Sequence, residues 1–181
     1  MRRNVALIGF MGAGKTTVGR ILAERLGMGF VETDELVEEI AGKPIPRIFE
    51  EDGEERFREL EAEAVRRASS MRGVIISCGG GVVLRSRNVE ALRRTCVIVY
   101  LKTSPEEAYR RTLGDEYRPL LKVGDRMARI RELLSMREPL YRSSADIVVE
   151  TDGLSPEEVA DRVIRALGGV LREGGRRQER G

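Results

Sequence analysis

The stretch that decides the fold is Gly9-Phe10-Met11-Gly12-Ala13-Gly14-Lys15-Thr16. It fits the pattern G-x-x-x-x-G-K-[ST], between an apolar run (residues 4–10) that predicts a buried strand and a stretch of helical apolar spacing (residues 15–26). Glycines let backbone amides surround phosphate oxygens, and the helix N-terminus adds a favourable dipole. We therefore expect nucleoside triphosphate binding, with Lys15 at the phosphates and the Thr16 hydroxyl on Mg²⁺.

The nucleotide is expected to be ATP. A guanine-specific switch protein normally carries Asn-Lys-x-Asp, but neither Asn4 nor Asn88 is followed by Lys. The residues expected to bind ATP in the loop and the first turn of the helix are Gly12, Ala13, Gly14, Lys15, Thr16 and Thr17.

Apolar runs and helical stretches alternate along the rest of the chain. Further strands are predicted at 29–32, 74–78, 96–101 and 146–150, and helices at 33–40, 54–69, 87–94, 105–112, 125–141 and 156–167, with a helical turn at 47–49. This alternation predicts an α/β three-layer sandwich with a five-stranded parallel sheet, in one domain over residues 1–168. The phosphate loop places nucleotide binding at the first strand of this sheet.

Two segments lie outside this alternation. Residues 113–124 join two helices and hold Gly114 and Gly124; a connection of that length is usually functional, so we expect a mobile lid. Residues 169–181 are rich in Gly and Arg without apolar periodicity, which predicts a disordered basic tail. A solvated end is favoured for this tail over a nucleic-acid or membrane contact.

Composition limits the chemistry that is available. The chain has 181 residues, no histidine and two cysteines, Cys78 and Cys96. This excludes His-dependent catalysis and a Cys-rich zinc site, and it leaves carboxylates, Lys, Arg, hydroxyls, backbone amides and a hard cation, a set that suits phosphoryl transfer. The net charge of +2 resides in the tail, so no nucleic-acid partner is expected. Without a long apolar run, we expect a cytoplasmic protein with no membrane contact. A monomer is also expected, although no sequence feature determines the oligomeric state.

Two carboxylates follow the second predicted strand, in Glu32-Thr33-Asp34. Ligands of open α/β sheets bind at the carboxyl ends of strands. One carboxylate can hold the water shell of Mg²⁺ while the other accepts the proton of an acceptor hydroxyl. The alternative for Asp34 is an N-cap of the following helix.

Two further features suggest a small anionic acceptor. Arg58 and Glu61 share one helix face, either as a surface ion pair or with Glu61 orienting Arg58 toward a substrate carboxylate. Gly79, Gly80 and Gly81 follow the third predicted strand directly. Three consecutive glycines favour close approach of a ligand to the main chain over a merely flexible turn.

Together with the loop, these motifs resemble the shikimate kinase family over nearly the whole chain. The matching segments are Thr33-Asp34, Asp52-Gly53-Glu54, Phe57-Arg58 with Glu61, Gly79-Gly80-Gly81, Arg118-Pro119-Leu120-Leu121 and Arg137-Glu138-Pro139-Leu140-Tyr141. The resemblance implies a P-loop kinase fold with a mobile lid and with substrate-binding helices at about 33–70. It also implies ATP- and Mg²⁺-dependent phosphorylation of the shikimate 3-hydroxyl, in the pathway to aromatic amino acids.

The resemblance also assigns roles to residues. Asp34 would be the base, Lys15 and Arg118 would neutralise the transferring group, and Arg111 and Pro156 would flank adenine. The residues implied to contact shikimate are Asp34, Arg58, Glu61, Gly79, Gly80, Gly81, Arg137, Phe49 and Phe57. From the residues alone, a solvated helix end is the alternative for Arg111, and core packing is the alternative for the two phenylalanines.

One departure from the family pattern concerns the metal. The family usually has Asp-x-Asp after the second strand, where this chain has Glu32-Thr33-Asp34. We expect Glu32 to serve as an outer-sphere Mg²⁺ ligand beside Thr16. A kinase of another hydroxy acid such as gluconate, or a non-catalytic nucleotide-binding module, is the alternative function.

Overall fold

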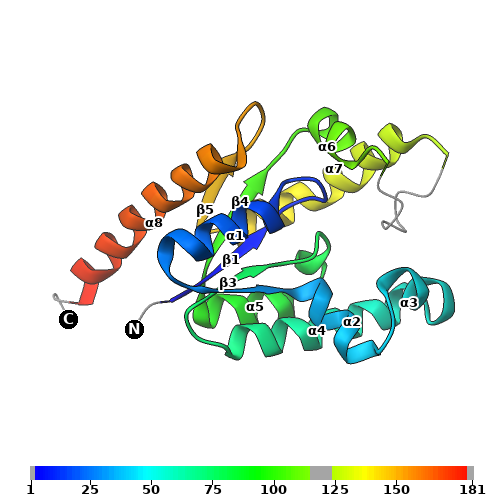
Figure 1. Ribbon diagram of the computed structural model, residues 1–181, viewed down its shortest axis with the longest axis horizontal. Coiled ribbons are helices and arrows are strands. Elements are labelled where there is room, and N and C mark those ends of the chain that lie inside the picture. Colours follow the sequence, from blue (N-terminus) through cyan, green and yellow to red (C-terminus); the bar gives the residue numbers. More distant parts are fainter. Residues whose placement is uncertain (1–2, 115–123, 179–181) are drawn as a thin grey trace.

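The computed structural model describes residues 3–114 and 124–178, with side chains up to residue 169. Its centre is a sheet of five parallel strands in the order β2-β3-β1-β4-β5 (Figure 1). The strands are β1 (Asn4–Ile8), β2 (Gly29–Glu32), β3 (Val74–Ser77), β4 (Cys96–Lys102) and β5 (Ile147–Glu150). The predicted five-stranded parallel α/β sheet is therefore confirmed.

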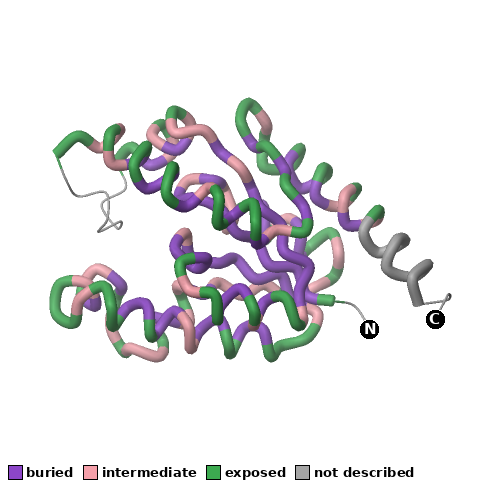
Figure 2. The backbone as a smooth tube through the Cα atoms, turned by 180° about the vertical axis from the view of Figure 1, so that it is seen from behind, coloured by how far each residue is buried: buried purple, intermediate pink, exposed green. Residues whose placement is uncertain are grey.

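Helices cover both faces of the sheet, because side chains of a strand alternate between its faces. In β1, Val5 and Leu7 pack toward α1 (Lys15–Leu26) and α8 (Pro156–Gln178). Ala6 and Ile8 belong to the core on the other face, beneath α4 (Gly53–Ser70), α5 (Ser86–Thr95) and α7 (Arg126–Ser144). Figure 2 shows the strands as a continuous buried centre with exposed residues on the outer helical surfaces.

The remaining helices lie toward the carboxyl ends of the strands (Figure 1). They are α2 (Thr33–Ala41), α3 (Ile45–Glu51), α6 (Pro105–Thr112) and the short 3₁₀ helix η1 (Val82–Leu84). The first two pack with α4 around a separate apolar cluster that contains Val37, Ile48, Phe57 and Leu60. This cluster supports one side of the site without contributing to the main core.

The order of the strands places a binding crevice between β1 and β3. These strands are neighbours, with Val5 opposite Ile75 and Leu7 opposite Ser77. The connection from β1 leads to the β2 edge, whereas the connection from β3 leads to β4 on the opposite side. Ligands of open α/β sheets bind at such a switch point, beyond the carboxyl ends of the strands.

Several boundaries differ from the expectation, and two of them have a clear physical reason. Strand β1 ends at Ile8 because Gly9 has a φ of +151° and begins the phosphate loop. Helix α8 continues to Gln178, whereas a disordered tail is predicted from residue 169. Glycine weakens a helix by about 1 kcal/mol but does not end it, and no proline follows Pro156, so Gly168 and Gly169 do not stop α8.

Most of the expected lid, residues 115–123 of the segment 113–124, lies outside the described residues. Within the part of the chain that the structure does describe, no helix is both long enough and apolar enough to cross a bilayer.

Candidate active site

A cleft of about 300 Å³ lies at the predicted switch point. It is lined by Gly12, Gly14, Lys15, Thr16, Thr17, Glu32, Asp34, Ser77, Cys78, Gly79, Gly80 and Arg111. The loop after β1, the end of β2 and the loop after β3 therefore meet in one hollow. Most of the residues singled out from the sequence for ATP and metal binding are among this lining.

The phosphate loop folds back on its own lysine. Lys15 begins α1, and its Nζ donates to the carbonyl oxygens of Gly9 at 2.7 Å and Phe10 at 3.0 Å. Gly14 precedes the helix with a φ of +90°, a left-handed conformation that L side chains rarely adopt. The ammonium group thus lies against the first residues of the loop, and the first amides of α1 follow its last residue, so both border the loop that is expected to hold phosphate.

The first turn of α1 also contacts the end of β2. The hydroxyl of Thr16 donates a hydrogen bond to Oε1 of Glu32. Both groups offer hard oxygen atoms as metal ligands, in a cleft next to a phosphate loop. Mg²⁺ commonly uses one or two such protein ligands plus phosphate oxygens. The residues present therefore fit a Mg²⁺ site.

Asp34 lies in the first turn of α2 and lines the cleft. The N-cap residue of this helix is Glu32, whose side chain makes no capping hydrogen bond. The N-cap alternative for Asp34 is therefore wrong. Its neighbour Thr33 instead accepts a hydrogen bond from the amide of Gly79 at 2.9 Å, which fixes α2 against the loop after β3.

Arg58 and Glu61 form a buried ion pair. Nη1 of Arg58 lies 2.9 Å from Oε1 of Glu61, and the two residues are 6% and 0% exposed. The surface ion pair alternative is therefore wrong. Burial raises the pKa of Glu61, and the positive charge of Arg58 acts against that rise. Within the described residues, the buried Oε2 of Glu61 has no hydrogen-bond partner.

Each glycine after β3 faces a polar side chain of the site. A Cβ on Gly79 would lie 2.8 Å from Oδ1 of Asp34 and 2.9 Å from Oε2 of Glu61. On Gly81 it would lie 2.1 Å from Nη1 of Arg58. On Gly80 it would lie 3.6 Å from Nη1 of Arg137. Side chains of the site therefore approach these glycines closely, and the ligand contact expected here stays a prediction.

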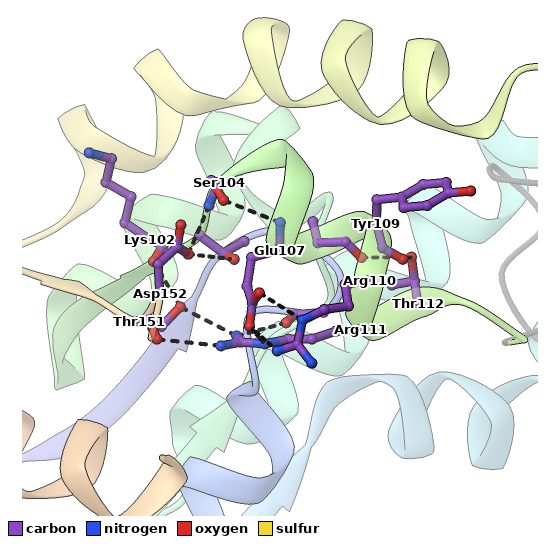
Figure 3. A network of polar contacts seen from close by, with 12 residues as sticks. Lys102, Ser104, Glu107, Tyr109, Arg110, Arg111, Thr112, Thr151 and Asp152 are labelled. Carbon is purple, nitrogen blue, oxygen red and sulfur yellow. Dashed lines mark hydrogen bonds and ion pairs between the residues drawn. The ribbon is translucent and has the colours of Figure 1, made fainter. Parts of the chain in front are cut away.

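Arg111 joins three parts of the nucleotide side (Figure 3). Its Nε donates to Glu107 at 2.8 Å, and its Nη1 donates to the carbonyl of Gly12 at 3.2 Å and the hydroxyl of Thr151 at 3.4 Å. The solvated helix end proposed as its alternative is therefore wrong. These contacts hold the guanidinium between α6, the phosphate loop and the turn that precedes α8.

Among the predicted residues that the structure describes, those that do not line this cleft are Ala13, Phe49, Phe57, Arg58, Glu61, Gly81, Arg137 and Pro156. Phe57 is buried in the cluster of α2, α3 and α4, and its ring centroid lies 4.6 Å from that of the partly exposed Phe49. Pro156 is exposed at the start of α8. Arg118 lies outside the described residues.

Two residues without a role in the sequence analysis contribute to the site. Glu107 anchors Arg111, and Tyr141 donates a hydrogen bond to the carbonyl of Gly80. Both were detectable in principle, because each lies four residues from a predicted arginine and so shares its helix face.

Comparison with known proteins agrees with this geometry. The model of the shikimate kinase family matches residues 11–168. A shikimate kinase of Caldanaerobacter subterraneus subsp. tengcongensis is 49% identical over 91% of this chain and 95% of its own. The shikimate kinase of Acinetobacter baumannii in complex with shikimate is 38% identical, with a TM-score of 0.90 over 92% of this chain and 93% of its own. That of Aquifex aeolicus is 35% identical, with a TM-score of 0.81 over 93% and 98%. The chain therefore belongs to the shikimate kinase family.

Proposed function

We propose that this chain transfers the γ-phosphoryl group of ATP to the 3-hydroxyl of shikimate, giving shikimate 3-phosphate. One observation supports this proposal most directly. The lysine of the phosphate loop and two buried arginines lie around the same three-glycine loop. Gly79 and Gly80 line the cleft beside Lys15, and the same loop packs against the buried guanidiniums of Arg58 and Arg137. A phosphate site therefore adjoins a site for a small anion.

Arg58 and Arg137 are proposed to hold the shikimate carboxylate. Both side chains are almost fully buried, where a charge-assisted hydrogen bond is stronger than at the surface. The uncommitted Oε2 of Glu61 can accept a hydrogen bond from a ring hydroxyl. The Gly79–Gly81 backbone forms the floor beneath the ring, and Phe57 with Phe49 supports this side of the site from the α2–α4 cluster.

ATP is proposed to bind along the loop Gly12–Thr17, with Arg111 and Pro156 on either side of adenine. Thr16 and Glu32 are the residues that would hold Mg²⁺. When bound, the ion neutralises phosphate charge. Glu32 is one methylene longer than the family's usual Asp, and its contact with Thr16 supports an outer-sphere role.

Asp34 is proposed to accept the proton of the 3-hydroxyl as the phosphoryl group transfers. Lys15 and, from the lid, Arg118 neutralise charge on that group. Closure of the lid excludes water, so ATP is not hydrolysed in place of the acceptor reaction.

The test is ADP release coupled to a spectroscopic readout, with ATP and either shikimate, gluconate or no acceptor, each with and without Mg²⁺. We expect ADP release that needs both shikimate and Mg²⁺. Faster turnover with gluconate than with shikimate would show that shikimate is not the preferred acceptor. ATP binding without any acceptor-dependent ADP release would support a non-catalytic module instead.

A further inference from the structure

Tyr141 lies in α7, one helical turn after Arg137, and is 0% exposed. Its hydroxyl donates a hydrogen bond to the carbonyl oxygen of Gly80, the middle glycine of the loop after β3. Burial raises the pKa of Tyr141 to about 12, while the nearby Arg137 acts in the opposite direction through its charge and a hydrogen bond. The phenol is therefore protonated and contacts both a glycine of the cleft and the arginine proposed to bind the acceptor.

The tyrosine ring is fixed from behind by a second tyrosine. Tyr100 of β4 stacks on Tyr141 with centroids 5.0 Å apart and an interplanar angle of 27°. Both rings belong to the core between the sheet and α7. Within the described part of the chain, the hydroxyl of Tyr100 has no hydrogen-bond partner. The two buried phenols thus share one packing environment, but only that of Tyr141 reaches the site.

Gly80 lies between the phosphate loop and the residues proposed to bind the acceptor, so its position affects both. It lines the cleft, and a Cβ on it would lie 3.5 Å from the amide nitrogen of Met11 in the phosphate loop. Its neighbours Gly79 and Gly81 pack against Glu61 and Arg58. A shift of the Gly80 carbonyl would therefore be felt by the groups on both sides of it.

We propose that Tyr141 is a positioning residue for acceptor binding: its hydroxyl ties Arg137 to the Gly80 carbonyl and holds both in the arrangement that the acceptor carboxylate and ring require. The proposal rests on the proposed role of Arg137 as a carboxylate ligand. Its consequence is graded, because Tyr141 contacts Arg137 directly and reaches the nucleotide side only through Gly80. Shikimate binding should therefore weaken more than ATP binding.

The test compares Tyr141→Phe with Tyr100→Phe. Each substitution removes one hydroxyl from the same stacked pair and keeps both rings. We expect Tyr141→Phe to raise the KM for shikimate about tenfold, the effect of losing a hydrogen bond to a charged group, with the KM for ATP within about twofold. Tyr100→Phe should leave both KM values unchanged. A KM for shikimate that is unchanged in Tyr141→Phe, whatever its thermal stability, would overturn the proposal.

A double-mutant cycle with Arg137→Ala separates this inference from the proposed function. We expect Arg137→Ala to raise the KM for shikimate strongly and Tyr141→Phe to add little in that background. If Arg137→Ala has no effect, the proposed carboxylate site fails. If Arg137→Ala raises this KM but the fold-changes of the two substitutions multiply in the double variant, the positioning role fails. Should Tyr141→Phe be too unstable for steady-state assays, calorimetric titration with shikimate in saturating AMP-PNP, which stabilises the folded state, gives the same comparison.

Discussion

The hydroxyl of Thr16 donates a hydrogen bond to the carboxylate of Glu32, which joins the first turn of α1 to the end of β2. The two residues are far apart in the sequence, but both lie at the carboxyl edge of the sheet and both line the cleft. A longer side chain at position 32 than the family's usual Asp is therefore accommodated by direct contact with the threonine that is expected to bind Mg²⁺.

This contact predicts how Mg²⁺ dependence responds to substitution. In Glu32→Gln the carboxylate charge is lost, and we expect the Mg²⁺ concentration for half-maximal activity to rise about 10- to 100-fold, as is typical for outer-shell partners of a metal. Glu32→Asp keeps the charge and should stay close to the original value. Magnesium titrations of initial rate measure both variants. An unchanged titration for Glu32→Gln would exclude the outer-sphere role.

Asp34→Asn should reduce turnover severely while ATP binding survives. The amide has nearly the same shape but cannot accept the hydroxyl proton, and loss of a general base typically lowers kcat about 10²- to 10⁴-fold. Rapid-quench turnover and calorimetric ATP binding provide the two readouts. The matched control is Glu35→Gln. Glu35 is exposed, and its ion pair with the exposed Arg20, at 3.8 Å, contributes little. Near-normal turnover in Asp34→Asn would exclude its role as the base.

The five strands and the phosphate loop could be predicted because both are local: apolar runs identify the strands, and the loop motif needs only the strand and helix beside it. The order of the strands in the sheet could not be predicted, because it depends on pairing between segments far apart in the sequence. The burial of the ion pair between Arg58 and Glu61 could not be predicted. Their spacing places them on one helix face but does not say whether that face is buried, and burial here depends on Gly81, which leaves room for the guanidinium. The end of α8 was also beyond prediction, because glycines weaken a helix without fixing where it stops.

Gly81→Ala should disrupt acceptor binding. The added Cβ would lie 2.1 Å from Nη1 and 2.6 Å from Cζ of Arg58, so the guanidinium or the loop must move. Overpacking of this kind costs about 1–3 kcal/mol, and we expect a rise of about tenfold or more in the KM for shikimate together with a lower melting temperature. Gly168→Ala in α8 is the control, because nothing lies within 4 Å of its Cβ position. Unchanged shikimate affinity in Gly81→Ala would show that Arg58 tolerates displacement.

Glu107→Gln should weaken ATP binding through Arg111. Glu107 accepts from Nε of Arg111, whose other nitrogens reach Gly12 and Thr151 (Figure 3). Losing the charge-assisted hydrogen bond should raise the KM for ATP up to about tenfold, with the KM for shikimate unchanged. Inhibition by tripolyphosphate, which has no base, should not change if Arg111 acts on adenine. Glu106→Gln, which changes an exposed carboxylate paired with Arg131 and not with Arg111, is the matched control.

The same carboxylate predicts a pH dependence of stability. The hydrogen bond from Arg110 lowers the pKa of Glu107 below its ordinary value of 4.5. A group with a lowered folded-state pKa contributes stability that is present above its unfolded pKa and is lost as the pH falls through the folded value. The difference in free energy of unfolding between the wild type and Glu107→Gln should therefore be constant above about pH 5 and shrink toward pH 3. Urea unfolding at several pH values measures this difference. A difference that grows in acid would show that folding raises, and does not lower, the pKa of Glu107.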